Sequence, residues 1–343
     1  MISVSAFRQG YLAGNSYQSD APQNLIAGHF DVLVVVSSWD RRCLCITDCP
    51  DLTASTAIGV YFDVRDSSGL RDAHDKAVEQ YCEMRGGLYE PIKGQSLDLP
   101  GMWGRIFGRI SQARRAAGRP IRICMDLSTC PRYYSISVLS RCLGQGIAES
   151  VTMLYAEGRY PKLNEGPELA LTGGKWATVP VPGLEGEYDP RKSRFYLISV
   201  GFEGMKTLRV TSKGDPERVS VLFPDPAVLP EYAEKTQRCN QDLFEQYRIP
   251  DEQVVRAPAG DAIGAWKALA EASLERPESE DAYYLCCGTK PHSIGLALHA
   301  MALGHPAVLY SVPEEHLVVN TQPIGVFWRF DVRDVCAVRE FAE

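Results

Sequence analysis

Four short segments of this 343-residue chain carry residue types that bind phosphate groups. Each combines hydroxyl or glycine residues with a lysine or arginine, and each follows an apolar run. Backbone N–H groups at a helix N-terminus, hydroxyl donors and a basic side chain are the groups with which proteins hold a phosphate. The residues that we expect to contact such a ligand are Ser37, Ser38, Asp40, Arg41, Ser128, Thr129, Arg132, Glu203, Lys206, Gly288, Thr289, Lys290, His292 and Ser293.

The chain contains an internal repeat. Thr129-Cys130-Pro131-Arg132 recurs as Thr289-Lys290-Pro291-His292, an offset of 289 − 129 = 160. An earlier apolar run, which ends at Asp40, recurs as one that ends at Glu203, an offset of 203 − 40 = 163. Two similar units in one polypeptide predict a pseudo-symmetric intrachain pair, whose natural binding site is the seam between equivalent loops.

Lys290 is the strongest single candidate for anion binding, and Cys130 takes its place in the first half. The two predicted sites are therefore not equivalent. An alternative interpretation is structural, because Ser, Thr and Gly residues before a helix are ordinary helix caps.

Apolar runs alternate with helical patterns along both halves. This alternation predicts parallel sheets with helices on both faces, in which a ligand lies outside the carboxyl ends of the strands. The four segments stand at such ends. We predict strands over 32–37, 57–64, 121–125, 151–155, 195–200, 219–223, 254–257, 283–287 and 307–311, and helices over 70–85, 102–117, 133–143, 230–247, 262–275 and 293–303.

The predicted fold class is α/β, with two tandem Rossmann-like, doubly wound parallel-sheet units related by internal duplication. The first unit is expected over 1–160 and the second over 191–343. The Gly- and Pro-rich segment 161–190 between them is expected to be a linker or a hairpin insertion.

Composition narrows the class of protein. Hydrophobic residues make up 45% of the chain and charged residues 23%, as in soluble globular proteins, and no apolar run approaches the roughly 20 residues of a membrane span. We expect a cytoplasmic protein without a signal peptide. The net charge of −7 argues against general coating of nucleic acid. The 11 cysteines lie in apolar segments, so we expect reduced and mostly buried thiols.

The segment Cys287-Gly288-Thr289-Lys290-Pro291 resembles the ligand-loop motif of CRISPR-associated Rossmann-fold (CARF) domains, together with a first-strand loop such as Ser37-Ser38 or Gly201-Phe202. The resemblance implies binding of cyclic oligonucleotides by a two-fold pair of Rossmann-like units, in prokaryotic antiviral defence. The first half departs from the motif, since Asp126 to Cys130 lacks its glycine and lysine.

Other ligand motifs are absent from the sequence. Neither first-strand loop supplies the G-x-G-x-x-G of dinucleotide-binding proteins, and Gly173-Gly174-Lys175 is followed by Trp176 rather than by the Ser or Thr of a P-loop. No G-x-S-x-G elbow of an α/β-hydrolase occurs. We therefore expect no cofactor.

Two residue clusters invite other interpretations. Cys43, Cys45 and Cys49 lack the paired C-x₂-C spacing of a zinc site. His292 lies beside the candidate ligand loop, His299 lies within the predicted helix 293–303 and His305 lies in the turn after it, so we expect no metal. The basic segment Arg105 to Arg122 is either a solvated helix face, a docking surface for an acidic partner, or a contact for nucleic acid.

The leading functional hypothesis is a component of a multi-protein prokaryotic system that binds a nucleotide or a nucleic-acid end. The resemblance implies that this system is antiviral defence. We expect protein partners and no association with a membrane. A second hypothesis is an enzyme that hydrolyses a nucleotide phosphodiester or glycosidic bond, with Asp40, Glu203, Asp126 or His292 as acid or base. A third is a non-catalytic scaffold subunit.

Overall fold

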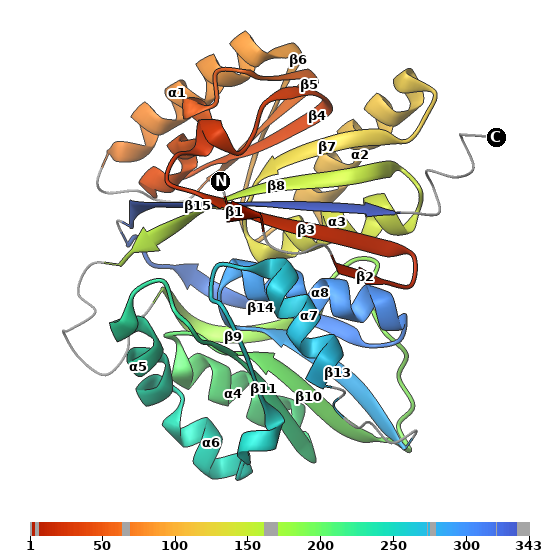
Figure 1. Cartoon of the computed structure of the whole chain (residues 1–343), viewed down its shortest axis with the longest axis vertical. Coiled ribbons are helices and arrows are strands. Elements are labelled where there is room, and N and C mark those ends of the chain that lie inside the picture. The colour runs from red at the N-terminus through yellow and green to blue at the C-terminus, as the bar shows by residue number, and fades with distance from the viewer. Residues whose placement is uncertain are drawn as a thin grey trace. The chain divides into compact units, whose positions relative to one another are not determined.

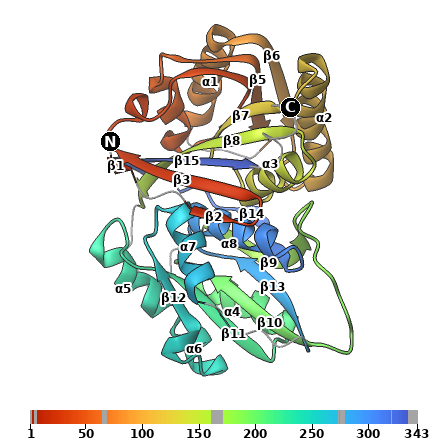
Figure 2. The same ribbon diagram turned by 45° about the vertical axis from the view of Figure 1, so that its right-hand side comes forward.

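The computed structural model describes residues 2–3, 7–63, 69–160, 171–272, 274, 279–319 and 321–334. The chain divides into two compact units. The first comprises Met1–Pro161 and Val318–Glu343, and the second comprises Lys162–Leu317. Each unit is built on one sheet with helices against it, as Figures 1 and 2 show.

The sheet of the first unit has nine strands, of which five are parallel and stand in the order β6-β5-β4-β7-β8. Numbered by their appearance in the chain, these five follow the order 3-2-1-4-5 of a Rossmann fold. Antiparallel strands continue the sheet beyond β8. The strands are β1 (Ile2–Ser3), β2 (Phe7–Gln9), β3 (Leu12–Ser19), β4 (Gly28–Ser37), β5 (Leu52–Phe62), β6 (Gly86–Gly94), β7 (Ile121–Asp126), β8 (Ala148–Arg159) and β15 (Gln322–Asp334).

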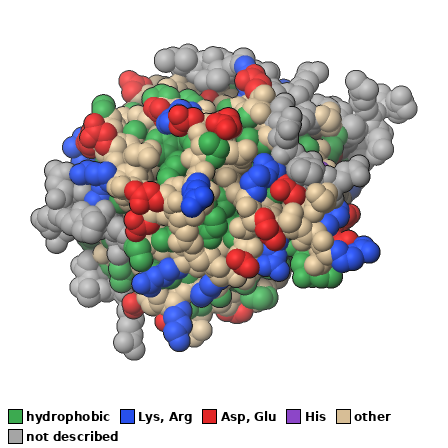
Figure 3. Space-filling model, turned by 90° about the horizontal axis from the view of Figure 1, so that it is seen from below, with side chains coloured by type: hydrophobic (Ala, Val, Ile, Leu, Met, Phe, Trp, Pro, Cys, Tyr) green, Lys and Arg blue, Asp and Glu red, His purple; other side chains and the backbone are tan. Residues whose placement is uncertain are grey.

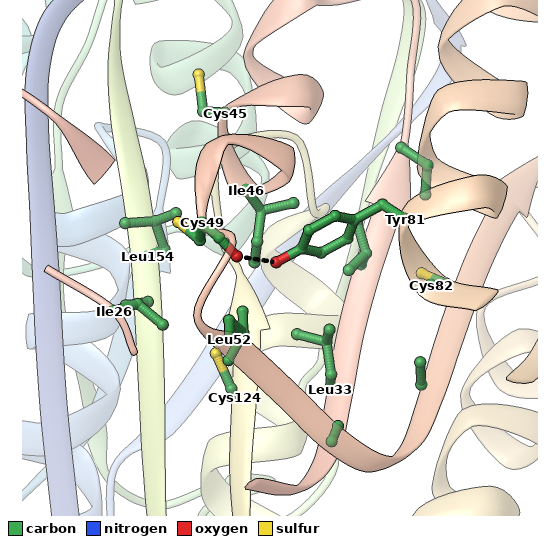
Figure 4. Close-up of a cluster of buried hydrophobic side chains, with 14 of the residues drawn as sticks. Ile26, Leu33, Cys45, Ile46, Cys49, Leu52, Tyr81, Cys82, Cys124 and Leu154 are labelled. Atoms are coloured by element: carbon green, nitrogen blue, oxygen red, sulfur yellow. Dashed lines mark hydrogen bonds between the residues drawn. The ribbon is translucent and has the colours of Figure 1, made fainter. Parts of the chain in front are cut away.

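Helices cover this sheet on both faces because its central strands are apolar on both faces. In β4, Leu33 and Val35 join the cluster packed under η2 and α1, while Val34 and Val36 are buried on the opposite face. The hydroxyl of Tyr81 on α1 donates a hydrogen bond to the carbonyl of Cys49 within this cluster (3.0 Å; Figure 4). The helices are η1 (Pro22–Asn24), η2 (Arg41–Asp48), α1 (Leu70–Arg85), α2 (Leu99–Ala117) and α3 (Arg132–Gly144).

The second unit repeats this plan. Its parallel strands stand in the order β12-β11-β10-β13-β14, again 3-2-1-4-5, and β9 pairs antiparallel with β14. Its strands are β9 (Thr172–Pro180), β10 (Ser193–Ser199), β11 (Arg218–Pro224), β12 (Val254–Ala257), β13 (Glu280–Cys286) and β14 (Ala307–His316). Its helices are α4 (Gly204–Gly214), α5 (Pro230–Cys239), α6 (Gln241–Tyr247), η3 (Asp251–Gln253), α7 (Ala262–Ala272) and α8 (Lys290–Leu303).

The predicted fold class is confirmed, since both units are α/β and Rossmann-like. They share the order of five parallel strands and an antiparallel sixth strand beside the fifth, which is the arrangement that an internal duplication produces.

The division of the chain differs from the expected one at two places. Residues 172–180, predicted to be linker or hairpin, form β9 of the second sheet, while 161–170 lie outside the described residues. Residues 322–334, assigned to the second unit, form β15 of the first sheet, between β8 and β3. A strand adds to whichever sheet edge offers unpaired N–H and C=O groups. The outer edge of β14 is already paired with β9, whereas that of β8 receives β15.

Nine of the ten described cysteines are buried, and all ten are thiols. Figure 4 shows Cys49, Cys82 and Cys124 among apolar side chains, and burial raises the pKa of Cys49 and of Cys82 to about 12. Within the described ranges no group of three or more His, Cys, Asp or Glu side chains is placed to hold a metal ion. No helix in that part of the chain is long and apolar enough to cross a bilayer.

Candidate functional site

The carboxyl ends of β10 and β13 lie side by side in the second unit. These strands are adjacent and parallel, with Ser199 beside Cys286, and the strand order reverses between them. In open α/β sheets this reversal is the point at which ligands bind. The loops that follow the two strands carry the predicted residues Glu203, Gly288 and Thr289.

Two glycines bring the backbones of these loops into contact. The hydroxyl of Ser199 accepts a hydrogen bond from the N–H of Gly288 (3.0 Å). A Cβ atom at Gly288 would lie 2.7 Å from the carbonyl oxygen of Val200, and one at Gly201 would lie 3.2 Å from that of Cys287. The two loops therefore pack backbone against backbone at these glycines, which leaves no room for a side chain there.

The loop after β12 contacts the start of α8. The hydroxyl of Thr289 donates to the carbonyl of Ala259 (2.8 Å) and accepts the N–H of His292 (3.2 Å), so it caps α8 and anchors it to this loop. The ring Nε2 of His292 lies 3.1 Å from the carbonyl oxygen of Pro258. The segments that follow β10, β12 and β13 thus meet beside the first turn of α8.

Lys290 is the first residue of α8 and is half-buried. No acidic residue lies in this first turn. The N-terminus of a 14-residue helix carries a partial positive charge, and the Lys290 ammonium adds a full one. Both charges favour an anion at this place. Anion binding at Lys290 stays a prediction from the sequence.

His292 and Ser293 hold the start of α8 in place. The His292 ring is fully buried, and burial lowers its pKa to about 4, so the ring is neutral at physiological pH. Because a carbonyl oxygen only accepts, Nε2 carries the ring proton, and Nδ1 is an acceptor with no hydrogen-bond partner among the described residues. The hydroxyl of Ser293 donates to the carbonyl of Thr289 (3.0 Å).

Glu203 and Lys206 form a buried ion pair in which Glu203 Oε2 and Lys206 Nζ are 2.9 Å apart. The other carboxylate oxygen of Glu203 accepts hydrogen bonds from the Thr172 hydroxyl (2.6 Å) and from the N–H of Leu171 (3.2 Å). These contacts tie the start of α4 to the segment that leads into β9. Both residues therefore have a role in the fold whether or not a ligand binds nearby.

In the first unit the predicted hydroxyl groups make hydrogen bonds within the protein. Ser37 donates to Asp75 (2.5 Å), and Thr129 donates to the carbonyl of Val36 (2.7 Å). The hydroxyl of Ser128 is buried and accepts the N–H of Ala156 (3.0 Å). That of Ser38 accepts the N–H of Asp40 (3.3 Å).

Asp40 pairs with Arg42 rather than with Arg41. Asp40 caps η2 by accepting the N–H of Arg42 (3.0 Å), and its carboxylate also forms a buried 2.6 Å ion pair with the Arg42 guanidinium, while Arg41 is exposed. The repeat at offset 163 is visible here, because Asp40 precedes η2 after β4 and Glu203 precedes α4 after β10. Each of the two acids pairs with a cation two or three residues later.

The repeat at offset 160 differs at its helix start. Lys290 corresponds to Cys130 (290 − 160 = 130), yet α3 begins only at Arg132, two residues further along (132 − 130 = 2). Arg132 is half-buried at that position. The two helices thus begin at different points of the repeat, but each begins with a cation and neither has an acidic residue in its first turn.

The basic segment 105–122 is partly neutralised by its neighbours. Arg109 forms an ion pair with Glu90 (3.2 Å), and Arg119 forms one with Asp31 (2.8 Å). The guanidinium of Arg105 donates to the carbonyl of Lys93 (2.7 Å). These contacts favour the interpretation as a solvated helix face.

Sequence reasoning missed two residues near strand ends. Asn240 lies between α5 and α6, where a single helix was predicted, and its side-chain amide donates to the carbonyl of Gly201 (2.7 Å), so it fixes the β10 loop. Glu157 is buried near the carboxyl end of β8. No motif pointed to either residue.

No protein-family model matches this chain and no curated protein matches it either, so the functional argument depends on the geometry of these loops.

Proposed function

We propose that this protein binds a nucleotide or another ligand with a terminal phosphate, and that the phosphate lies at the first turn of α8, against Lys290. The observation that carries the proposal is the position of this turn. It combines a helix N-terminus and a lysine with two closely packed loops at the point where the strand order reverses.

Binding is favoured over hydrolysis by the state of the candidate acids and bases. Asp126 and His292 are 0% exposed, and Asp40 and Glu203 are 8% exposed. The carboxylates of Asp40 and Glu203 are held in buried ion pairs, and His292 is neutral. A general acid or base must reach the proton that it transfers, and these groups face the protein interior.

The wider role follows from the resemblance of the Gly288–Pro291 loop to CARF domains. On that basis we propose that binding serves a multi-protein prokaryotic antiviral defence system, with the ligand controlling association with protein partners.

Isothermal titration of the whole chain with mono-, di- and cyclic nucleotides and with short DNA and RNA oligomers tests the binding proposal. We expect at least one of them to bind, and Lys290→Ala to weaken that binding at least tenfold. A ligand at 100 times its Kd should also stabilise the protein by about 2.7 kcal/mol in thermal unfolding.

Lys267→Ala is the matched control. Lys267 lies in α7 of the same unit, is half exposed and pairs with Glu271 (3.8 Å), so its loss should leave the affinity unchanged. Equal affinity in the wild type and in Lys290→Ala would refute the proposed site, and absence of binding to every member of the panel would refute the proposed function.

A further inference from the structure

A separate cavity of the second unit lies between β9 and α4. It has a volume of about 630 Å³, within the range of roughly 300 to 1,000 Å³ that small-molecule sites occupy. Its α4 residues, from Leu208 to Lys213, lie one to two turns beyond the start of that helix at Gly204. None of the residues proposed above to bind a phosphate lines it.

Among the described residues, three cations and no carboxylate line this cavity. Lys175 comes from β9, Arg209 and Lys213 come from α4, and all three are exposed. Arg209 and Lys213 are four residues apart and so share a helix face, where like charges repel each other. Both are placed next to Trp176. The guanidinium carbon of Arg209 lies 5.8 Å from the centre of the Trp176 ring, and Lys213 Nζ donates to the Trp176 carbonyl (2.8 Å).

Some basic side chains of the unit have carboxylate partners, as in Lys206 with Glu203, Arg218 with Glu280 and Arg256 with Asp225. Others, such as Arg238 and Arg248, are exposed and have none in the described structure. The three cavity cations make no ion pair in the described structure. The chain as a whole is acidic, with a net charge of −7, and Figure 3 shows basic and acidic side chains interspersed on the face that it displays.

An acid on the strand beside β9 binds the backbone. Glu314 on β14 accepts the N–H of Lys175 through its Oε2 (2.9 Å) and packs against Gly174. It thus fixes the β9 strand at the rim of the cavity. The three cations of the cavity are exposed, so a ligand can reach them.

The remaining wall is partly apolar and partly polar. Trp176 is partly buried, and Leu208 and Val210 make up the apolar part with it. Gly174, Ser212 and Gln246 complete the lining. We propose that this cavity binds a small molecule that carries two or more phosphate groups on an aromatic body, the chemical class of nucleoside di- and triphosphates. The phosphates pair with Lys175, Arg209 and Lys213, and the ring packs against the apolar wall. This site is independent of the one at Lys290.

The test is isothermal titration of the whole chain with ATP, inorganic triphosphate, AMP and adenosine. We expect ATP to bind most tightly and inorganic triphosphate to bind more weakly. AMP should bind at least tenfold more weakly than ATP, and adenosine should give no measurable heat of binding. The double variant Arg209→Gln/Lys213→Gln should weaken ATP binding at this site at least tenfold, and affinity should fall as salt rises. Arg256→Gln, which removes a cation of the same unit outside the cavity, should change nothing.

The two proposed sites are separated by their variants. Lys290→Ala should leave binding at the cavity intact, and Arg209→Gln/Lys213→Gln should leave binding at the α8 turn intact. The cavity proposal is overturned if ATP and triphosphate give no heat, or if the double variant binds as the wild type does. It is also overturned if only oligonucleotides bind through these residues.

Discussion

Glu157 on β8 is a buried carboxylic acid whose protonation should affect stability. It is 5% exposed, and its Oε1 has no hydrogen-bond partner among the described residues. Burial raises its pKa from 4.5 to about 7, although the Arg42 guanidinium opposes this shift. The folded protein therefore holds a proton that the unfolded chain releases above pH 4.5. Stability from this group is present at low pH and is lost as the pH rises toward 7.

We expect the free energy of unfolding of the wild type to fall, relative to Glu157→Gln, by about 2 to 3 kcal/mol between pH 5 and pH 8, at about 1.4 kcal/mol per pKa unit. Glutamine has the same shape and does not titrate. Urea unfolding of both proteins at four pH values measures the difference. The comparison also cancels the opposite effect of His292, whose lowered pKa removes stability as the pH falls from 6.5 toward 4. Parallel stability curves for the two proteins would contradict the raised pKa of Glu157.

The repeated residues Thr129 and Thr289 make different contacts with the helices that follow them. Thr289 caps α8 and is bonded to the Ala259 carbonyl, whereas Thr129 bonds to the Val36 carbonyl and the cap of α3 is Pro131, without a side-chain hydrogen bond. Thr289→Ala should cost about 1 to 2 kcal/mol of stability, because a cap and a second hydrogen bond are lost.

Thr129→Ala is the matched variant, and it should cost about 1 kcal/mol or less, since only one hydrogen bond is lost. Chemical unfolding of the two variants measures both values. Thr289→Ser, which keeps the hydroxyl, should recover most of the loss. If Thr129→Ala proves as costly as Thr289→Ala, the helix-cap difference between the repeats is not energetically significant.

Elements with strong local patterns could be predicted from the sequence, and elements defined by distant partners could not. The continuous apolar run of β4 and the periodic pattern of α1 are local signals, and α1 occupies the predicted range 70–85. β6 starts with two glycines and contains a proline, so its composition resembles a turn. β15 takes its place through pairing with β8 and β3, and the register between strands so far apart in the chain cannot be derived from a short segment.

The same distinction applies to the candidate site. The sequence located the loops after β10 and β13, because strand ends and the Gly-Thr-Lys segment are local features. It could not tell which charged groups are already paired, as Glu203 is with Lys206, since that depends on burial. Nor could it find the cavity beside Trp176, because β9 was not expected to be a strand and its contact with α4 was therefore not foreseen.

At the scale of the whole molecule, the chain leaves the first sheet, builds the second and returns to the first. β15 pairs on one side with β8 and on the other with β3, and it buries Phe330 and Val332 completely. The sheet of the second unit contains no strand from outside Lys162–Leu317 in the described structure. The first unit thus depends on residues that follow the second unit in the chain, and the second unit does not depend on residues outside its own range.

Removal of β15 should therefore unfold one unit and spare the other. A chain that ends at Leu317 lacks the strand between β8 and β3 and several buried aromatic side chains, each of which contributes about 1.5 to 3 kcal/mol by burial. Since a domain is stable by only about 5 to 15 kcal/mol, this loss is enough to unfold the first unit. Hydrogen–deuterium exchange should show protection lost in β4, β7 and β8 and kept in β10 and β13. A chain that ends at Asp334 keeps β15 and should retain protection in both units. Loss of protection in both sheets of the shorter chain, or in neither, would contradict this dependence.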